Sequence, residues 1–461
     1  MILAADIGST WLKAALFAPD GRRFPVAKAP LDYRVRSFER AEIDPLALRR
    51  TFLDLIDRAL TLAGCSRADL RRIAITSQAQ SFCLCNPAGI PLTPMLGWTD
   101  ARAGTEAEDL QRRLGSTFHR TTGFPAVSPL STLAKVLWWS RHGGLPPDVR
   151  VVQISSWLAM ALGAPHVTDT NLAAMCGLFS IPDHNWWDEA LDVAGLSRAA
   201  QLGSVVDPGV PLPTAEENRP SGFIPELEVV LAANDHTAGA VACGCRSGKP
   251  VLTLGTSGVI YRHAGKQSGP FSPTGVWGPF PGGGYYELLF LSHACSALDW
   301  ADGFLFGKVD SVRLVERALA NGLPCSAPFF DPSRWGSGNA WSDRGTPEEM
   351  AYATLEGIAF ALSALGGSAL GRSEGAITVL GGGSRLGRWV QLLADVFKRP
   401  CVCGTRDGLD GAAAIAGIPL APCGEKESHF LPDSVRSHFL DDRFLKWQSA
   451  FPAITPSPAT P

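Results

Sequence analysis

The stretch ILAADIGST at residues 2–10 decides the expected fold, because a similar unit recurs about 250 residues later. An apolar strand runs into a turn of glycine and hydroxyl residues at 8–10, and a second apolar strand follows. At residues 251–261 another apolar strand reaches a similar turn at 255–258, and again a second strand follows. One such unit is an ordinary hairpin. Two copies predict two lobes of similar fold that face one another.

Helix and strand patterns alternate through much of the rest of the chain. Asp44 and Pro45 form the start of a predicted helix with one apolar stripe. Residues 346–349 form a capping box that opens a long helix, and a buried strand is expected at 377–380. This alternation predicts an α/β protein. The tail at 419–461 is rich in proline and weakly patterned, so we expect a surface extension or partial disorder there.

Length and composition restrict the class of protein. The 461 residues predict two or three domains, and 46% hydrophobic residues supply large buried cores. The net charge of -3 argues against partners such as nucleic acid or a membrane surface, which attract basic proteins. The N-terminus does not resemble a signal peptide, and no uninterrupted apolar stretch approaches the length of a membrane span.

The eleven cysteines include three pairs spaced as CxC, at 83/85, 243/245 and 401/403. Alternate residues of a strand share one face, so each pair could hold a metal or act in redox chemistry. Small buried thiols in a reducing compartment are the favoured interpretation. We therefore predict a cytoplasmic protein.

Three turns of glycine and hydroxyl residues each follow a predicted strand, at 8–10, 255–258 and 381–384. Glycine lets the backbone approach a ligand closely, and free N–H groups with hydroxyls bind anionic oxygens. Any one of these turns is weak evidence, but three predict a polyphosphate site. The segment 244–249 is one residue too short for a Walker A loop, and no glycine run fits GxGxxG. The nucleotide site must therefore be of another type.

Asp6 stands directly before the first of these turns. A carboxylate beside a phosphate-binding turn would repel ATP unless a cation such as Mg²⁺ lay between them. The alternative is an aspartate that caps its own turn.

Asp235 lies in LAANDHTAGA, residues 231–240, where an apolar strand ends and a helix of small residues begins. Ligand sites of α/β proteins tend to lie at such strand ends. The alternative is a helix N-cap, and the two roles are compatible because one oxygen can cap while the other faces the ligand. A carboxylate within hydrogen-bond reach of a hydroxyl can take its proton as a phosphoryl group arrives.

These motifs together resemble the FGGY family of carbohydrate kinases over about residues 1 to 418. The order and spacing of the motifs are more specific than any one of them. The matching segments are Asp6 to Thr10, Gly97 to Arg102, Ser131 to Trp138, Thr168 to Phe179, Asp235 to Ala240, Leu254 to Gly258, and Gly381 to Ser384 with Trp389, Gln391 and Asp395.

The resemblance implies a two-lobed, actin-like ATPase fold of ribonuclease-H-like domains with a cleft between the lobes. It implies a sugar-binding lobe at 1–238, a nucleotide-binding lobe at 239–418 and a tail at 419–461. The implied cofactors are ATP and Mg²⁺, and closure of the cleft would exclude water. Asp235 is the implied general base, and Asp6 organises the metal. The residues expected to bind the nucleotide are Asp6, Gly8, Ser9, Thr10, Lys13, Gly255, Thr256, Ser257, Gly382, Gly383 and Ser384.

The expected sugar side departs from the best-known members of the family. Xylulokinases usually carry Met-His where this chain has Ala79-Gln80, and glycerol kinases carry Arg-Glu there. Gln78 and Gln80 can donate and accept hydrogen bonds, which suits sugar hydroxyls without selecting a particular one. The expected acceptor is a ketopentose such as xylulose or ribulose, or a related ketose or polyol. His236 stands where Asn is common in xylulokinases, and Ala233-Asn234 replaces a common Gly-Gly.

Two more residues complete the expected substrate site. Trp98 could stack on a sugar or fill the core, and Asp100 could bind a sugar hydroxyl or pair with Arg102. The predicted substrate-binding residues are Gln78, Gln80, Trp98, Asp100, Asp235 and His236.

Two other functions stay open at this stage. An actin-like ATPase would hydrolyse ATP without a sugar, and a catalytically idle sugar-binding regulator would bind sugar without turnover. Asp6 and Asp235 favour the enzyme. The expected partner is a small sugar or polyol, with no nucleic acid and no membrane, and a homodimer is left open.

Overall fold

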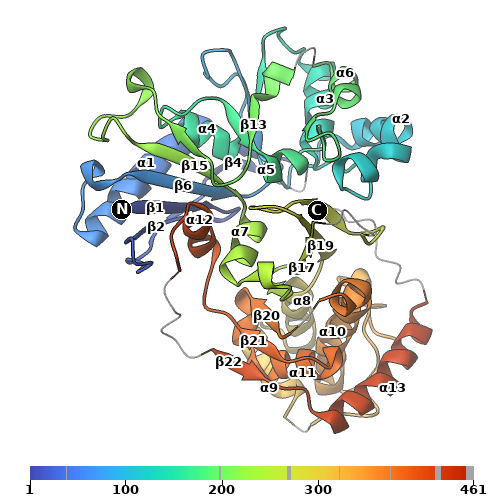
Figure 1. Cartoon of the computed structure of the whole chain (residues 1–461). Coiled ribbons are helices and arrows are strands. Elements are labelled where there is room, and N and C mark those ends of the chain that lie inside the picture. Colours follow the sequence, from blue (N-terminus) through green and yellow to red (C-terminus); the bar gives the residue numbers. More distant parts are fainter. Residues whose placement is uncertain are drawn as a thin grey trace.

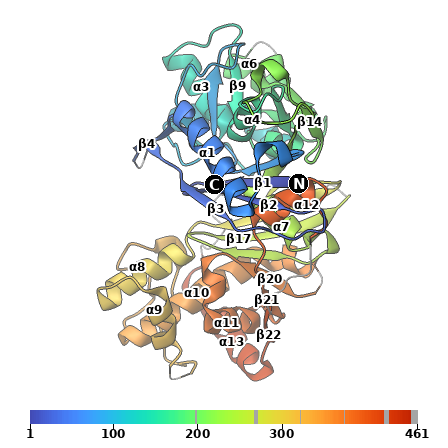
Figure 2. The ribbon, with the colours of Figure 1, turned by 90° about the vertical axis from the view of Figure 1, so that its left-hand side faces the viewer.

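The chain forms two lobes, stacked one above the other in Figures 1 and 2. The computed structural model describes residues 1–37, 39–196, 199–266, 271–320, 322–373, 375–420 and 427–452. Each lobe is built on a mixed β-sheet with helices packed against it. The predicted α/β class and two-lobed fold are confirmed.

The N-terminal lobe contains a six-stranded sheet with the order β14-β15-β6-β1-β2-β3. Strands β1, β2 and β3 are antiparallel neighbours, while β6 and β15 run parallel to β1. The apolar residues of β1 are buried on both faces, as expected of a central strand. In the order of the sheet, the bounds are Pro211–Pro213, Glu228–Asn234, Arg72–Ser77, Ile2–Ile7, Trp11–Phe17 and Ala27–Pro30.

The C-terminal lobe repeats this topology in a seven-stranded sheet, with the order β18-β19-β17-β16-β20-β21-β22. Strands β16, β17 and β19 are antiparallel neighbours, and β20 and β21 run parallel to β16. The core order β3-β2-β1-β6-β15 therefore matches β19-β17-β16-β20-β21, which is the repeat that the two turns predicted. In sheet order, the bounds are Val276–Pro279, Tyr285–Leu291, Gly258–Gly265, Val251–Leu254, Ile377–Leu380, Cys401–Cys403 and Ser428–Phe430.

The remaining elements extend these two sheets. A second sheet of the N-terminal lobe has the order β4-β5-β8-β7-β9. In sheet order, the bounds of its strands are Tyr33–Arg36, Ala41–Ile43, Met95–Leu96, Phe82–Cys85 and Arg150–Gln153. Two further two-stranded sheets are present. One pairs β10 (Val167–Asp169) with β13 (Ser204–Val206), and the other pairs β11 (Phe179–Ser180) with β12 (Asn185–Trp186). The helices of this lobe are α1 (Pro45–Ala63), α2 (Gly104–Thr122), α3 (Thr132–His142), α4 (Ile154–Met160), α5 (Thr170–Ala174) and α6 (Asp188–Ala194).

The helices of the second half are α7 (Asp235–Ala242), α8 (Cys295–Phe306), α9 (Ser311–Ala318), α10 (Pro347–Gly371), α11 (Gly387–Phe397), α12 (Gly408–Ile415) and α13 (Ser434–Ala450). Two of them cross between the lobes. Helix α12 follows strand β21 of the C-terminal sheet but packs its apolar residues on β1, β2, β6 and β15, and Figure 1 shows it beside the blue strands β1 and β2. Helix α7 follows β15 and packs Ala240 against residues of β16 and β17.

These two helices also touch one another closely. A Cβ atom built on Gly411 of α12 would lie 1.8 Å from the backbone oxygen of Ala238 in α7. Only glycine permits that approach. The residue range 239–418 thus includes a helix that lies on the N-terminal sheet.

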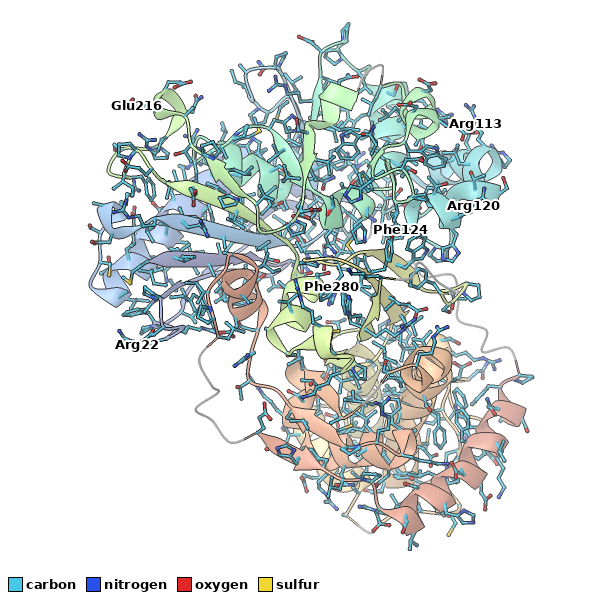
Figure 3. The ribbon with its side chains drawn as sticks, viewed as in Figure 1. Arg22, Arg113, Arg120, Phe124, Glu216 and Phe280 are labelled. Atoms are coloured by element: carbon cyan, nitrogen blue, oxygen red, sulfur yellow. The ribbon has the colours of Figure 1, made fainter. Side chains whose placement is uncertain are left out.

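A second junction joins the lobes through β18. The Trp277 N–H donates to the Gly123 oxygen at 3.1 Å, and Asn171 Nδ2 donates to the Pro279 oxygen at 2.9 Å. Phe124 and Phe280 come from opposite lobes and both belong to one buried cluster; Figure 3 labels them where the lobes meet.

The expectation of a surface extension or partial disorder in the tail is wrong for residues 428–450. Strand β22 joins the C-terminal sheet, and α13 buries Leu440, Arg443 and Trp447. Arg443 pairs with the buried Glu356 at 2.6 Å, so a polar contact fixes the helix in addition to apolar packing. Two of the buried residues, Ser437 and Arg443, are polar, and the apolar Val435 and Leu445 are exposed, which explains why the apolar pattern is weak. Residues 421–426 and 453–461 of the predicted tail lie outside the described residues.

Helix α10 contains a window, Pro347–Gly367, that is long and apolar enough to cross a membrane. That window contains Glu356, and 72% of it is buried inside the protein. It contributes much of the main cluster of the C-terminal lobe, as a core helix does.

Candidate active site

Three neighbouring strands of the N-terminal sheet end together at one edge. Ile7 of β1 pairs with Ser77 of β6, and Ser77 pairs with Asn234 of β15. The next residues along these strands are Gly8, Gln78 and Asp235, so the register brings three predicted site residues to the same edge. Carboxyl ends of parallel strands are the usual place for ligand sites in α/β sheets.

Asp6 is buried just behind this edge, with 6% of its surface exposed. Its Oδ2 accepts from Lys13 Nζ at 3.2 Å, whereas its Oδ1 is buried and has no partner among the described residues. Burial raises the pKa of Asp6 to about 6, and Lys13 opposes this while the charges of Asp235 and Asp407 add to it. An unpartnered carboxylate oxygen among other carboxylates fits a site that receives a cation.

The N-terminus of α12, the helix that lies on the N-terminal sheet, faces the same carboxylate. A Cβ built on Gly408 would lie 3.3 Å from Asp6 Oδ2, so glycine leaves room there. Asp407 caps this helix and forms hydrogen bonds with Arg23, which also binds Asp410. Residues 407 and 408 were not among the predicted site residues.

Asp235 is the first residue of α7, and it is not the helix cap. The cap is Asn234, whose side chain accepts from the Thr237 N–H at 2.9 Å. Asp235 Oδ1 accepts only from the N–H of His236 at 2.9 Å, and the side chain is half-buried. The alternative that Asp235 serves as the N-cap is therefore wrong, and its second oxygen has no hydrogen bond among the described residues.

A buried polar network holds the backbone that carries Asp235. Asn171 Oδ1 accepts from the N–H and the side chain of Asn234, and Asn171 Nδ2 donates to Thr237 Oγ1. Thr237 Oγ1 lies 2.8 Å from Tyr261 Oη of the C-terminal lobe. Such a network is rigid when its members are satisfied. Sequence reasoning missed this role, although the segment from Thr168 had been recognised as a motif.

Asp169 supports the residue before this network. Its Oδ2 accepts from the Ala233 N–H at 3.2 Å and its Oδ1 from the Leu172 N–H at 2.9 Å. Ala233 adopts φ 61°, a left-handed conformation that favours glycine. The site thus keeps a strained residue two positions before Asp235, where the surrounding bonds fix it.

The two glutamines of the β6–β7 turn differ sharply. Gln78 is buried, and neither Nε2 nor Oε1 of its amide has a partner among the described residues. Gln80 Oε1 accepts from the Thr132 N–H at 2.8 Å. The unsatisfied amide of Gln78 is the group here that most needs a polar ligand, since buried polar atoms are nearly always bonded.

The other predicted sugar contacts also differ in whether they already have partners within the protein. Asp100 is fully buried, with oxygens that accept from Arg102 Nε at 2.7 Å and from the Ala41 N–H at 2.8 Å. It therefore fixes its own loop. Trp98 and His236 are half-buried, and no ring contact among the described residues involves Trp98.

The second and third glycine turns touch one another. Cβ atoms built on Gly381 and Gly383 would lie 2.4 Å from the oxygen and 2.7 Å from Cβ of Leu254, the residue before Gly255. The predicted phosphate and adenosine segments therefore form one surface. Thr256 and Gly382 are exposed, and Ser384 Oγ donates to the Gly381 oxygen at 2.7 Å.

No group of three or more His, Cys, Asp or Glu side chains within the described part of the chain could hold a metal by itself. Mg²⁺ commonly binds through one or two carboxylates, with phosphate oxygens and water completing its shell, so Asp6 fits a site shared with a nucleotide. Cys83 and Cys85 lie with their sulfur atoms 3.6 Å apart as buried free thiols.

Two family models match the chain. The model of the FGGY family of carbohydrate kinases, N-terminal domain, matches residues 1–242, and that of the C-terminal domain matches residues 251–419.

Individual relatives agree with these models over nearly the whole length. A glycerol kinase of Citrifermentans bemidjiense is 27% identical, covering 90% of each chain. The xylulose kinase of Escherichia coli is 26% identical, covering 95% of each chain. A crystal structure of ligand-bound xylulose kinase from Lactobacillus acidophilus superposes with a TM-score of 0.86 over 98% of each chain, at 21% identity.

Proposed function

The chain belongs to the FGGY family of carbohydrate kinases, and from that premise we propose that it transfers the γ-phosphoryl group of ATP to a hydroxyl of a small sugar or polyol, with Asp235 as the general base. The observation that carries this proposal is the convergence of Gly8, Gln78 and Asp235 at one edge of the sheet. The buried Asp6 lies just behind that edge. That edge offers a hydrogen-bonding amide, a carboxylate base and a glycine turn for phosphate.

The acceptor is a neutral polyhydroxy compound. We propose a ketopentose such as xylulose or ribulose, or a related ketose or polyol, because the unsatisfied amide of Gln78 can donate to one hydroxyl and accept from another. The names of the relatives support this range, since they include kinases of glycerol and of xylulose. Trp98 and His236, both half-buried, complete the sugar side.

Asp235 takes the proton of the attacking hydroxyl. Its Oδ1 is oriented by the N–H of His236, and its other oxygen is available to the sugar. As the sugar oxygen bonds to the γ-phosphorus, the bond from that phosphorus to the β,γ-bridging oxygen breaks. ADP leaves with that electron pair, while Asp235 becomes a neutral carboxylic acid.

ATP and Mg²⁺ fit the residues on the other side of Asp235. Bound Mg²⁺ would neutralise phosphate charge, and Asp6 would hold it, directly or through water, with its unpartnered Oδ1. The residues proposed to hold the nucleotide are Gly8, Ser9, Thr10 and Lys13 in the first lobe, and Gly255, Thr256, Ser257, Gly382, Gly383 and Ser384 in the second. Lys13 also limits the charge that Asp6 presents, because the two form an ion pair.

We also propose that the lobe of residues 1–238 binds the sugar and that of 239–418 the nucleotide, with α12 as an exchanged helix. The enzyme would act in the cytoplasm on a small-molecule partner.

The test is ATP consumption by the purified protein with Mg²⁺ across ketopentoses, ketohexoses, tetritols, pentitols and glycerol. We expect one acceptor to give a rate well above the sugar-free rate. A flat panel with high basal hydrolysis would indicate an actin-like ATPase. A flat panel without hydrolysis, together with tight binding of one sugar, would indicate an idle sugar-binding regulator.

A further inference from the structure

Lys135 is a fully buried ammonium group that the proposed reaction does not use. It lies in α3 with no exposed surface. No carboxylate approaches its Nζ within 4.0 Å in the part of the chain that the structure describes. Burial lowers the pKa of Lys135 to about 7, while the charge of Asp100 raises it. An unpaired buried cation is costly, so a residue that served only packing would be apolar.

The contacts of Lys135 join two separate loops. Its Nζ donates to the Gln80 oxygen at 2.8 Å and to the Gly97 oxygen at 3.0 Å. Gln78 lies two residues before the first acceptor, and Trp98 directly follows the second. These are the two proposed sugar contacts that do not belong to the segment of Asp235.

Gln80 shows how firmly one of these loops is held. It adopts φ 62°, which is uncommon for any residue except glycine. Its backbone oxygen is bound by Lys135, and its side-chain oxygen by the Thr132 N–H, three residues earlier in α3. Helix α3 thus forms two hydrogen bonds with Gln80, one to its backbone and one to its side chain. These bonds fix the strained conformation of Gln80, because such a conformation persists only where its surroundings hold it.

The second loop is held from both sides as well. The Gly97 N–H donates to the Ala41 oxygen at 2.7 Å while its own oxygen accepts from Lys135. A Cβ on Gly97 would meet Ala41 Cβ at 3.2 Å, so this backbone has little freedom. Trp98 follows this anchored residue directly in the chain.

We propose that Lys135 is a positioning residue that sets the distance between the Gln78 amide and the Trp98 indole, and that Gln80 belongs to this clamp and does not bind the sugar itself. This inference rests on the proposed function, because the two side chains must face a sugar for their spacing to matter. The clamp acts on sugar recognition and leaves the transfer of the phosphoryl group to other residues.

The first experiment compares Lys135→Met with wild type, using the best acceptor of the panel. We expect the KM for the sugar to rise at least about 10-fold, because two hydrogen bonds to charged nitrogen are lost. We expect kcat and the KM for ATP to stay within about 3-fold. The matched control is Lys308→Met, an exposed lysine outside the site, which leaves all three constants unchanged. If kcat instead fell by a factor as large as the one expected for KM, and the KM for the sugar stayed unchanged, the clamp would be overturned.

A pair of variants at Gln80 keeps the test valid even if Lys135→Met folds poorly. Gln80→Glu retains an oxygen that accepts from the Thr132 N–H, whereas Gln80→Met does not. If Gln80 positions the turn, the Glu variant keeps a sugar KM near wild type and the Met variant raises it as Lys135→Met does. If Gln80 binds the sugar through its NH₂ group, both variants raise the KM alike, which contradicts the proposal.

Hydrogen exchange of the sugar-free protein separates this inference from the proposed function. Lys135→Met should speed exchange in peptides that cover residues 78–82 and 96–99, while a peptide from α1 stays as protected as in wild type. Unchanged protection would overturn the clamp even in an active kinase. An inactive wild type with loosened peptides would reject the sugar-kinase proposal and, with it, the sugar-recognition role of the clamp.

Discussion

The turn after β1 and the turn after β16 occupy the same place in two sheets of the same topology, yet they carry different chemistry. When Gly8 is aligned with Gly255, Asp6 corresponds to Thr253. Asp6 is buried beside Lys13 with one oxygen unpartnered, whereas Thr253 is a half-buried neutral residue.

The difference shows that a repeated fold need not repeat its function. Several carboxylates lie near one another at the N-terminal edge, since the charges of Asp235 and Asp407 both raise the pKa of Asp6. The C-terminal edge offers backbone and hydroxyl groups of Gly255 to Ser257, against which the third glycine turn packs. One half therefore supplies charge and the other neutral donors, although both use a strand, a glycine turn and a strand.

Within this comparison of the two turns, the largest expected effect comes from removing the charge of Asp6. Asp6→Asn should lower kcat with Mg²⁺ and ATP by about 100-fold or more, because the anchor of the cation loses its charge. Thr253→Val should change kcat less than about 3-fold, since no charge is involved. Steady-state kinetics at saturating sugar measures both. Equal losses in the two variants would mean that the two turns share one role.

The next effect tests the helices that the lobes exchange. Gly411→Ala places a methyl group against the Ala238 oxygen and should lower the free energy of unfolding by about 3 kcal/mol or more. Gly367→Ala is the matched control in a helix, because nothing lies within 4 Å of its added Cβ. That control should gain up to about 1 kcal/mol. Chemical denaturation compares them, and equal stabilities would refute the close crossing.

Much of the fold could be predicted from the sequence because its signals are local. The strands beginning at Ile2 and Val251 are apolar runs that end in glycine turns, and both lie where the pattern indicated. The exchange of α12 could not be predicted in this way, because its small residues fit either sheet. The periodicity of a helix identifies its buried face but not the surface that covers it.

Some features of the candidate site could also be predicted from the sequence, and others could not. Asp6 and Asp235 were predicted from their places at strand ends, and the register brings the second beside Gln78. The different states of Gln78 and Gln80 could not be predicted, because both are glutamines in one turn. Only the path of the chain decides that the Thr132 N–H satisfies one and leaves the other unbonded.

A third prediction uses pH to distinguish the charged half from the neutral one. Burial raises the pKa of Asp169 from 3.8 to about 6. The native state therefore binds more protons than the unfolded state between these values, and Asp169 lowers stability as pH rises through that window. Asp169→Asn removes this dependence.

The difference in unfolding free energy between that variant and wild type should move in favour of the variant by about 2 to 3 kcal/mol from pH 4 to pH 7. The loss of one acceptor for a backbone N–H adds an offset that does not vary with pH. Thr253→Val removes no titratable group and should give a constant difference. Chemical denaturation at a series of pH values measures both differences. A difference between Asp169→Asn and wild type that does not change with pH would contradict the effect of burial.

The smallest effect concerns the backbone before Asp235. Ala233→Gly should relieve the cost of a positive φ, which is about 1 to 2 kcal/mol. The greater freedom of glycine in the unfolded chain opposes this by about 0.5 to 1 kcal/mol. We expect a net gain near 0.5 kcal/mol by the balance of these terms. Ala232→Gly, a buried neighbour outside the left-handed region, should instead lose stability.

The measurement that tests the central claim most directly compares Asp235→Ala and Asp235→Asn with wild type in single-turnover phosphorylation, alongside binding of Mg²⁺·ATP. We predict that both variants lose about 1000-fold or more in the rate of phosphoryl transfer, because neither can accept the proton of the hydroxyl. We predict that nucleotide affinity stays within about 3-fold. Transfer at a rate near that of wild type in either variant would contradict the role of Asp235 as the base.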